Sequence, residues 1–304
     1  MDTAPVTPAR LRSSVIAVPP LARHADGSLN PGANERLIRH IEAGGVNILL
    51  YGGNANLYHV RPSEYRSLLE MLTQLAGPDT LITPSVGPAY GLMMDQAEIA
   101  RSFDFPTVMV LPQSGITTPA GAEEGIRHFA RAYGRPVVVY IKQEGYLNPE
   151  NVARLADEGL VSWVKYAIVR ENSAVDPYLD ELVKIVDPSL IVSGIGEQPA
   201  IIHLRNFGIN GFTAGCVCVR PDLSQAMLRH IIAGDIAAAE RIRSIFVPLE
   251  DLRNSINPIR VLHEAVALAG IAETGPLQPL MSNLASSDVP AVAEAARALL
   301  AATL

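Results

Sequence analysis

Lysine is scarce in this chain of 304 residues. Only three of its 24 basic residues are lysines, Lys142, Lys165 and Lys184, and the others are arginines. The net charge of −7 at pH 7 is spread along the sequence rather than gathered into blocks. Dispersed negative charge favours solubility but offers no basic surface to a polyanion. We therefore expect no nucleic-acid partner.

Long hydrophobic runs are missing as well. No apolar stretch approaches the roughly 20 residues that a membrane-spanning helix needs. The first residues, Met1–Arg12, lack the basic-then-apolar layout of a signal peptide. The sequence thus predicts no membrane partner and a cytoplasmic location.

Cysteine and metal-binding motifs are equally sparse. The two cysteines, Cys216 and Cys218, are too few for a disulfide framework and stand only two positions apart. We interpret them as reduced thiols that pack at the rim of a pocket. The seven histidines show no paired spacing such as His-Glu-x-x-His, so no metal site is expected.

One of the three lysines lies where a charge is costly. Lys165 stands inside the apolar run Leu160–Val169, which contains no other charged residue. A low-dielectric interior destabilises an ammonium, lowers its pKa and makes the neutral, nucleophilic amine accessible near pH 7. Such a lysine is a candidate for Schiff-base chemistry on a carbonyl substrate. The alternative is a lysine at the end of a strand, with its stem packed and its head in water.

Short β-rich runs alternate with amphipathic stretches over most of the chain. The eight strand candidates are Ser14–Val18, Val46–Tyr51, Leu81–Val86, Thr107–Leu111, Val137–Ile141, Ser162–Val169, Leu190–Ser193 and Gly211–Ala214. Helical patterns lie between them at Ala33–Ala43, Pro62–Leu75, Asp95–Phe103, Ala120–Tyr133, Pro149–Glu158, Asp176–Val186, Gln198–Phe207 and Pro221–Ala233. Because each pair of parallel strands needs a crossover helix, this alternation predicts an α/β fold, the (β/α)8 TIM barrel.

The alternation stops after Ala233. Three further stretches, Ile236–Asn254, Pro258–Ala269 and Val289–Ala302, all have helical patterns. We therefore predict a flexible N-terminal segment over residues 1–12, the barrel over 13–233 and a C-terminal helical region over 234–304. A doubly wound open sheet is the alternative fold, but Ser193–Gly196 lacks the third glycine of its dinucleotide-binding loop.

Barrel chemistry gathers at the carboxyl ends of the strands, where side chains from different strands meet. Lys165 shares one face of its strand with Trp163 and Ala167, so the period of two predicts that it points inward. Tyr140 closes the preceding strand, and neighbouring strands run about 4.8 Å apart. Its phenol is therefore a candidate proton carrier beside an imine on Lys165, although an aromatic that simply packs the barrel is the other interpretation.

These residues resemble a known family, the dihydrodipicolinate synthase/N-acetylneuraminate lyase family of class I aldolases. Val138–Tyr140, followed by Trp163–Lys165, look like the family's tyrosine and Schiff-base lysine on strands five and six. The resemblance extends from about Ser14 to Leu300. Supporting matches are Asp26–Leu29, Ile191–Gly194, Gly208–Ala214 and Asn257-Pro258.

The resemblance implies a mechanism and a type of partner. Lys165 would attack the ketone of pyruvate or a related 2-oxo acid, and Tyr140 would move protons as the imine becomes an enamine. A carbon–carbon bond would then form or break, or a sugar acid would be dehydrated. The family uses neither a metal nor an organic cofactor, and its members are commonly homotetramers. We accordingly expect a small-molecule 2-oxo acid substrate, no cofactor, and a homo-oligomer, either a tetramer or a dimer.

The sequence departs from the family pattern in the loops. Where the family has Gly-Thr-Thr-Gly-Glu after strand two, this chain has Gly52–Asn56, so both threonine hydroxyls are missing. Backbone N–H groups at Gly53 and the Asn54 amide remain as donors for a carboxylate. Pro112–Ser114 replaces a tyrosine pair after strand four. The arginine that dihydrodipicolinate synthases use for an acidic second substrate has no counterpart in Lys142–Tyr146, which argues against aspartate semialdehyde as the second substrate.

The candidate site therefore consists of two catalytic residues and several substrate-binding positions. Lys165 and Tyr140 are the catalytic candidates, and the substrate-binding candidates are Gly53, Asn54, Ser114, Gly194 and Thr213. Weaker candidates are Tyr51, His59 and Ser193; Lys142 or Tyr146 would stand in for the missing arginine. The leading hypothesis is a cofactor-free aldolase, lyase or dehydratase. The alternative, favoured by the lost hydroxyls, is a degenerate barrel that binds a keto or sugar acid as a sensor or assembly protein.

Overall fold

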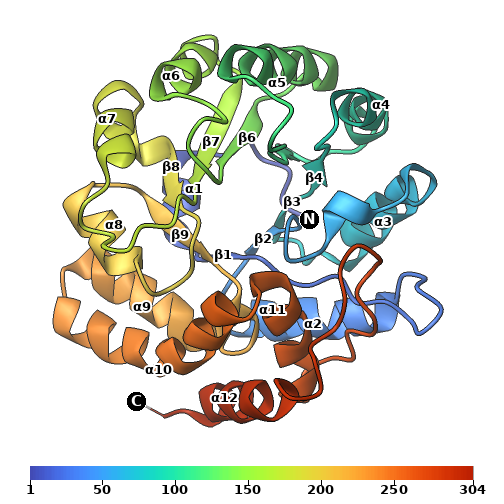
Figure 1. Ribbon diagram of the computed structural model, residues 1–304, viewed down its shortest axis with the longest axis vertical. Helices are drawn as coiled ribbons and strands as arrows, with labels where there is room; N and C mark the ends of the chain where they lie inside the picture. The colour runs from blue at the N-terminus through green and yellow to red at the C-terminus, as the bar shows by residue number, and fades with distance from the viewer. Residues whose placement is uncertain (304) are drawn as a thin grey trace.

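The computed structural model describes residues 1–303, and its centre is a closed parallel barrel (Figure 1). The strands follow one another around the ring in the order β3-β2-β1-β9-β8-β7-β6-β5-β4. Their bounds are β1 Ile16–Ala17, β2 Ile48–Leu50, β3 Leu81–Thr83, β4 Ser85–Val86, β5 Met109–Val110, β6 Val137–Ile141, β7 Val161–Tyr166, β8 Ile191–Ser193 and β9 Gly211–Ala214. The predicted (β/α)8 barrel is therefore confirmed.

The ring closes through a strand that proline divides in two. The predicted third strand, Leu81–Val86, is interrupted at Pro84, which has no N–H to donate to a ladder. Its first half, β3, pairs with β2, and its second half, β4, pairs with β5. The two outer members of the strand order are thus consecutive pieces of one extended segment, and the nine strands form eight positions around the barrel.

Helices surround the barrel, and many of them begin at a proline because its fixed φ suits the first helical turn. The helices of the ring are α2 Pro31–Ala43, α3 Pro62–Leu75, α4 Tyr90–Arg101, α5 Pro119–Tyr133, α6 Pro149–Asp157, α7 Pro177–Ile185, α8 Ala200–Asn206 and α9 Pro221–Ala233. Three short 3-10 helices, η1 Leu57–His59, η2 Pro188–Leu190 and η3 Cys216–Cys218, lie in the connections. Every residue of β6 is buried, as expected of a strand enclosed by helices on one side and barrel core on the other.

Three helices follow the barrel, as the sequence predicts. They are α10 Ile236–Ser255, α11 Pro258–Leu268 and α12 Val289–Ala301. Figure 1 shows them together on one side of the molecule, next to α2 and α9, with α11 nearest the centre of the barrel. The buried side chains Phe246 and Leu249 of α10 belong to the main hydrophobic core. The C-terminal region is thus packed onto the barrel.

The N-terminal segment, expected to be flexible, carries a short helix, α1 Pro8–Ser13. Arg10 of this helix donates hydrogen bonds to the Asn47 side chain at 2.8 Å and to the Asp79 carbonyl at 2.9 Å. These bonds connect the segment to the loops that precede β2 and β3. The division of the chain at residues 13 and 233 stays a prediction. Among the described residues, no helix combines the length and apolarity that crossing a membrane requires.

Candidate active site

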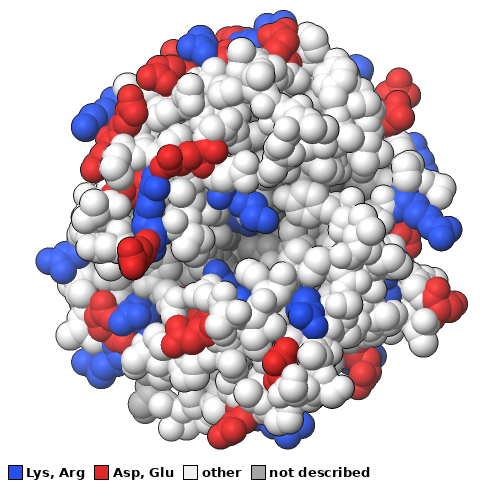
Figure 2. Space-filling view, in the orientation of Figure 1, with Lys and Arg blue, Asp and Glu red and all other residues white. Residues whose placement is uncertain are grey.

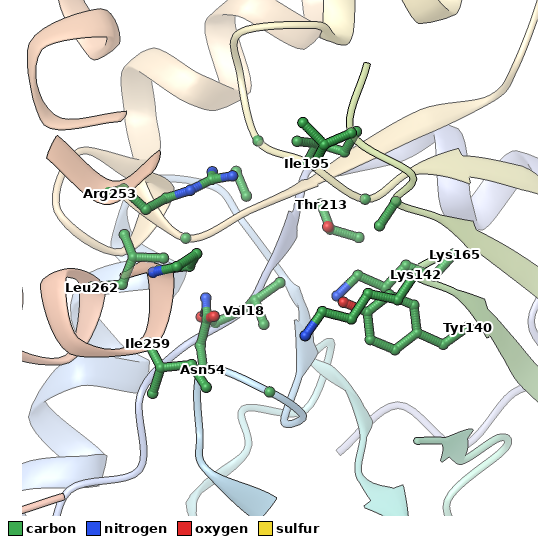
Figure 3. Close-up of a pocket in the computed structure, with 18 of the residues that line it drawn as sticks. Val18, Asn54, Tyr140, Lys142, Lys165, Ile195, Thr213, Arg253, Ile259 and Leu262 are labelled. Atoms are coloured by element: carbon green, nitrogen blue, oxygen red, sulfur yellow. Dashed lines mark hydrogen bonds between the residues drawn. The ribbon is translucent and has the colours of Figure 1, made fainter. Parts of the chain in front are cut away.

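A cavity of about 200 Å³ opens at the carboxyl ends of the strands. Its walls come from the ends of β6, β7, β8 and β9, the loops after β1 and β2, and the C-terminal helices α10 and α11. Figure 3 shows Lys165, Tyr140 and Lys142 on one wall and Arg253 and Leu262 on the opposite one. This is the position at which parallel barrels carry their chemistry.

Lys165 is buried at this cavity, with only 4% of its surface exposed. Burial is the main cause that lowers its pKa, to about 7, and the positive charges of Lys142 and Arg253 lower it further. The structure contains no carboxylate that forms a salt bridge with Lys165 among the described residues. The sequence-based expectation of a buried, inward-facing lysine with a lowered pKa thus agrees with the geometry, and a neutral amine is available near pH 7.

Tyr140 is the direct cross-strand partner of Lys165 in the β6–β7 ladder. The Lys165 Nζ atom lies 4.4 Å from the centre of the Tyr140 ring. Burial raises the pKa of Tyr140 to about 12, so its hydroxyl keeps its proton over the neutral range. The phenol and the amine therefore face the same space, one as a protonated acid and the other as a partly neutral base.

Gly194 makes room for this arrangement. A Cβ atom added at Gly194 would lie 2.7 Å from the Ala167 Cβ, 2.8 Å from the Tyr166 carbonyl oxygen and 3.0 Å from the Lys165 Cγ. Only glycine lets the end of β8 pass so close to β7. The Gly194 backbone can therefore line the cavity beside Lys165, as the sequence predicts for a substrate-binding position.

Three other predicted binding positions also line the cavity. Gly53 and Asn54 lie in the loop after β2, and Thr213 lies on β9. The Asn54 Nδ2 atom donates a hydrogen bond to the Val18 carbonyl at 3.1 Å, which holds this side chain at the cavity wall. The structure thus brings six of the seven candidate residues together.

Ser114 is the candidate that the structure does not bring to the cavity. It is exposed, and its hydroxyl donates to the Gln143 side chain at 3.0 Å. The loop after β5 turns outward here, since Gly115 and Ile116 are also exposed. Ser114 therefore lies on the surface, away from Lys165.

The weaker candidates are spread over other parts of the molecule. Tyr51 is fully buried outside the cavity, and its hydroxyl has no hydrogen-bond partner among the described residues. His59 and Tyr146 line two other hollows. Cys216 and Cys218 are free and buried behind the cavity rather than at its rim. Lys142 does line the cavity, near its mouth.

Sequence reasoning did not find two polar residues of the cavity, Tyr58 and Arg253. Tyr58 lies in η1, and burial together with the neighbouring Tyr140 raises the pKa of its phenol. Arg253 extends from the last turn of α10. The signal for Tyr58 is a phenol seven residues after the end of the predicted strand Val46–Tyr51. The nearest signal for Arg253 is only the Asn257-Pro258 pair at the start of the next helix.

The cavity wall is electrostatically one-sided. Lys142, Lys165 and Arg253 line it, and no aspartate or glutamate does so among the described residues. Figure 2 shows basic side chains around the central hollow of this face, with acidic side chains farther out. A concave site that is lined by positive charges attracts anionic ligands. The arrangement is suited to a carboxylate-bearing substrate.

A cluster of buried groups lies behind this wall. The ligand atoms of Glu197, Cys216 and Glu250 all lie within 4.8 Å of one another, a spacing that a metal ion could use. Both Glu250 oxygens already accept hydrogen bonds, from the backbone N–H groups of Glu197 at 3.1 Å and Gln198 at 2.8 Å, and from Arg253 at 3.1 Å. Burial raises the pKa of the Cys216 thiol well above its ordinary value. These groups are therefore better suited to holding Arg253 in position than to binding a metal ion.

Comparison with known proteins identifies the family to which this chain belongs. The model of the dihydrodipicolinate synthetase family matches residues 12–298. The chain belongs to this family. The match includes the barrel and the C-terminal helices, and the resemblance seen in the sequence is confirmed.

The relatives are distant but extend over nearly the whole chain. A protein of Xanthobacter autotrophicus named probable 5-dehydro-4-deoxyglucarate dehydratase is 24% identical, over 90% of this chain and 91% of its own length. A 4-hydroxy-tetrahydrodipicolinate synthase of Methanopyrus kandleri is also 24% identical, over 86% and 88%. The crystal structure of dihydrodipicolinate synthase from Bacillus clausii superposes with a TM-score of 0.84 at 23% identity, over 94% and 97%. Family membership and these names support an aldolase or lyase activity at the level of the family.

Proposed function

We propose that the protein is a Schiff-base-forming lyase or aldolase that acts on pyruvate or a related 2-oxo acid. The observation that carries the proposal is Lys165: it is buried at the mouth of the barrel, its pKa is lowered to about 7, and it faces Tyr140. A lysine without a carboxylate partner at the end of a barrel strand costs folding free energy, and such residues are characteristic of catalytic sites.

The chemistry begins with the neutral Lys165 amine. Its lone pair attacks the ketone carbon of the 2-oxo acid, and the resulting carbinolamine loses its hydroxyl as water to leave a protonated imine. The positive imine nitrogen then draws electrons from the neighbouring carbon, which gives up a proton and forms an enamine. Tyr140 is placed to carry these protons, because its hydroxyl remains protonated at neutral pH and can donate and accept through one oxygen.

Because both threonine hydroxyls of the family loop are missing, other groups must bind the substrate carboxylate and carry protons. The backbone at Gly53 and the Asn54 amide are donors for the carboxylate next to the reacting ketone. Tyr58 contributes a second, half-buried phenol to the cavity near Tyr140, and we assign the second proton transfer to it. A phenol pair thus replaces a relay through threonine.

The enamine is common to several outcomes. It can add to an aldehyde, release one, or expel a hydroxyl group as water. The names of the two relatives include a synthase and a dehydratase, so both outcomes are compatible with the family. We propose that the imine and the enamine form on Lys165 without a cofactor. We also predict that the protein is a cytoplasmic homo-oligomer, either a dimer or a tetramer.

Reductive trapping tests this proposal. Borohydride added in the presence of pyruvate should reduce the imine and leave the mass of the reduced ligand on the peptide that contains Lys165. Lys165→Ala should abolish the adduct, whereas Lys184→Ala should retain it, because Lys184 is an exposed residue of α7. An adduct that appears equally in Lys165→Ala, or no adduct with any 2-oxo acid, contradicts the proposal.

One observation favours a second candidate, a barrel that binds a keto or sugar acid without turnover. Both threonine hydroxyls of the family loop are absent, and Ser114 lies outside the cavity. Such a binder could also form an imine, so trapping alone does not separate the two candidates. Turnover measured over a panel of 2-oxo acids does, since a binder would show none.

A further inference from the structure

We propose that Lys142 binds the carboxylate next to the reacting ketone, as a cation on the same wall of the cavity as Lys165. Two lysines would then hold neighbouring carbons of the 2-oxo acid, Lys165 the ketone carbon and Lys142 the carboxylate. This inference rests on the proposed imine at Lys165. It gives Lys142 a role other than the one expected from the sequence, which was to replace an arginine that binds a second substrate.

The strands place Lys142 close to Lys165. In the β6–β7 ladder Tyr140 pairs with Lys165, and beyond that pair the Ala167 N–H donates a hydrogen bond to the Ile141 carbonyl at 2.8 Å. Lys142 directly follows β6, two positions after Tyr140, and side chains two positions apart on a strand share a face. Lys142 and Lys165 both line the cavity, and Figure 3 shows them on one wall.

The space between the two amines is open to a small ligand. Ala167 is the next residue on the Lys165 face of its strand, and its methyl group also lines the cavity. Such a small side chain leaves room for the longer Lys142 side chain and for a ligand. The charge of Lys142 acts on the Lys165 amine and is, after burial, the largest cause that lowers its pKa. The two nitrogens therefore border the same part of the cavity.

Lys142 has no anionic partner in the part of the chain that the structure describes. It forms no salt bridge, and Glu144, the nearest acidic residue in the sequence, pairs with Arg170 instead. Among the described residues, no aspartate or glutamate lines the cavity. The exposed Lys142 side chain is thus a cation at the mouth of the cavity whose charge an anionic ligand can neutralise.

Arg253, the cation across the cavity, is less suited to this task. It already donates a hydrogen bond to Glu250 at 3.1 Å, and Figure 3 shows it on the wall opposite Lys165. The carboxylate of a 2-oxo acid is bonded directly to the ketone carbon. Once that carbon is joined to Lys165, the carboxylate stays near the Lys165 wall, where Lys142 is the available cation.

One cation would act on both reactants. In the free protein the Lys142 charge disfavours a proton on Lys165, which keeps the amine nucleophilic. When the 2-oxo acid enters, the same charge attracts its carboxylate and so directs the ketone carbon toward the amine. This attraction would compensate in part for the threonine hydroxyls that are missing after β2.

Pyruvate and pyruvamide, in which a neutral amide replaces the carboxylate, test the assignment. We would measure the concentration dependence of borohydride trapping at about pH 8.5, where the Lys165 amine, with a pKa of about 7, is mostly neutral. The wild-type protein should be half-saturated at a lower concentration of pyruvate than of pyruvamide. In Lys142→Met this preference should fall by about three- to tenfold, a range between those of an exposed ion pair and a buried charged hydrogen bond.

Two further variants make the result specific. Lys142→Arg keeps a cation at this position and should retain most of the preference for pyruvate. Lys184→Met removes an exposed lysine of α7, away from the cavity, and should show the wild-type preference. Because the preference is a ratio between two ligands, a change in the pKa of Lys165 affects both trapping reactions and cancels.

The outcomes separate the two proposals. Equal weakening of both ligands in Lys142→Met would mean that Lys142 acts only through the Lys165 amine or the fold, and would overturn the carboxylate assignment alone. A wild-type preference in Lys142→Met, a loss in Lys142→Arg as large as in Lys142→Met, or no preference in the wild-type protein would also overturn it. No adduct with either ligand in the wild-type protein would overturn the imine at Lys165 and this inference with it.

Discussion

At the scale of single residues, the site depends on a nitrogen atom that the fold holds away from water. Lys165 is predictable from the sequence because a lone lysine within an apolar, strand-like run has few structural uses. Tyr140 is predictable because it lies near the carboxyl end of the adjacent strand, and the two residues are indeed cross-strand partners. Substitutions at these two positions test the proposed chemistry.

Lys165→Met should stabilise the protein, and the gain should depend on pH. The folded protein releases the Lys165 proton near pH 7, whereas the unfolded chain keeps it up to about 10.5. Between these values the unfolded state binds more protons, so wild-type stability rises with pH, and the penalty is fully present below pH 7. The increase in unfolding free energy on replacement should therefore be on the order of a few kcal/mol at pH 6 and shrink towards pH 10.

Denaturant unfolding of both proteins at several pH values measures this difference. Lys184→Met, at an exposed position on α7, is the matched control and should show no such pH dependence. A stability difference that stays constant from pH 6 to pH 10 in Lys165→Met would show that the amine is not held at a lowered pKa.

Tyr140→Phe should separate imine formation from turnover. The substitution removes the hydroxyl but keeps the ring that lies beside the Lys165 amine. We expect borohydride trapping to persist and turnover of the best 2-oxo acid to fall by about 10²- to 10⁴-fold, the usual contribution of a positioned acid or base. Unchanged turnover would remove Tyr140 from the mechanism and leave Tyr58 as the candidate proton carrier.

Arg253 and Tyr58 show where sequence reasoning stops at this scale. Lys165 and Tyr140 are recognisable because their strands carry a period of two, which sets the direction of each side chain. Arg253 lies on a helix outside the barrel repeat, and only the packing of α10 against the barrel brings it to the cavity. Tyr58 lies in a loop, where no periodicity indicates a direction. Ser114 also lies in a loop, and the same lack of periodicity explains why the sequence did not indicate its position on the surface.

At the scale of elements, the close contact between β7 and β8 holds the site together. Gly194→Ala should destabilise the protein by about 1–3 kcal/mol, because the new methyl group would press on Ala167 and on the Lys165 stem. It should also slow imine formation in the fraction that folds. Thermal unfolding and the trapping rate measure the two effects, with Gly91→Ala as control, since a Cβ at Gly91 in helix α4 meets no atom within 4 Å. Wild-type values for Gly194→Ala would show that β8 does not constrain Lys165.

Helix boundaries follow the sequence where the start signals are strong. Helices α3 and α9 begin at prolines and match their predicted ranges, because proline fixes the first turn. Helix α4 begins at Tyr90, five residues before its predicted start, and its N-cap, Ala89, has no capping side chain to reveal it. The third strand was predicted as continuous, whereas Pro84 divides it. Local chemistry thus determines some element ends, and tertiary packing determines the others.

At the scale of the whole molecule, the C-terminal helices complete the active-site cavity. They supply Arg253, Asn257 and Leu262 to its wall. The sequence predicts these helices and the barrel as neighbouring regions, but no pattern in the sequence shows that the cavity lies between them. That relation depends on long-range packing, here through the buried side chains of α10 in the main core.

This packing predicts a single unfolding transition for the barrel and the helices. The chain contains one tryptophan, Trp163, which is buried in β7 and reports on the barrel interior, whereas far-ultraviolet circular dichroism reports mainly on helices. The two signals should change with the same midpoint in denaturant, as expected of one cooperative unit. Loss of helical signal before the change in Trp163 fluorescence would show that the C-terminal region unfolds on its own.

A crystal structure of the protein soaked with pyruvate at about pH 8 examines the proposed imine directly, because the Lys165 amine, with a pKa of about 7, is then mostly neutral. We predict continuous electron density from Lys165 Nζ to the second carbon of the ligand, with the ligand carboxylate beside Gly53 and Asn54. Pyruvate bound in the cavity without a bond to Lys165, or an empty cavity with Lys165 turned away from it, would contradict the Schiff-base function.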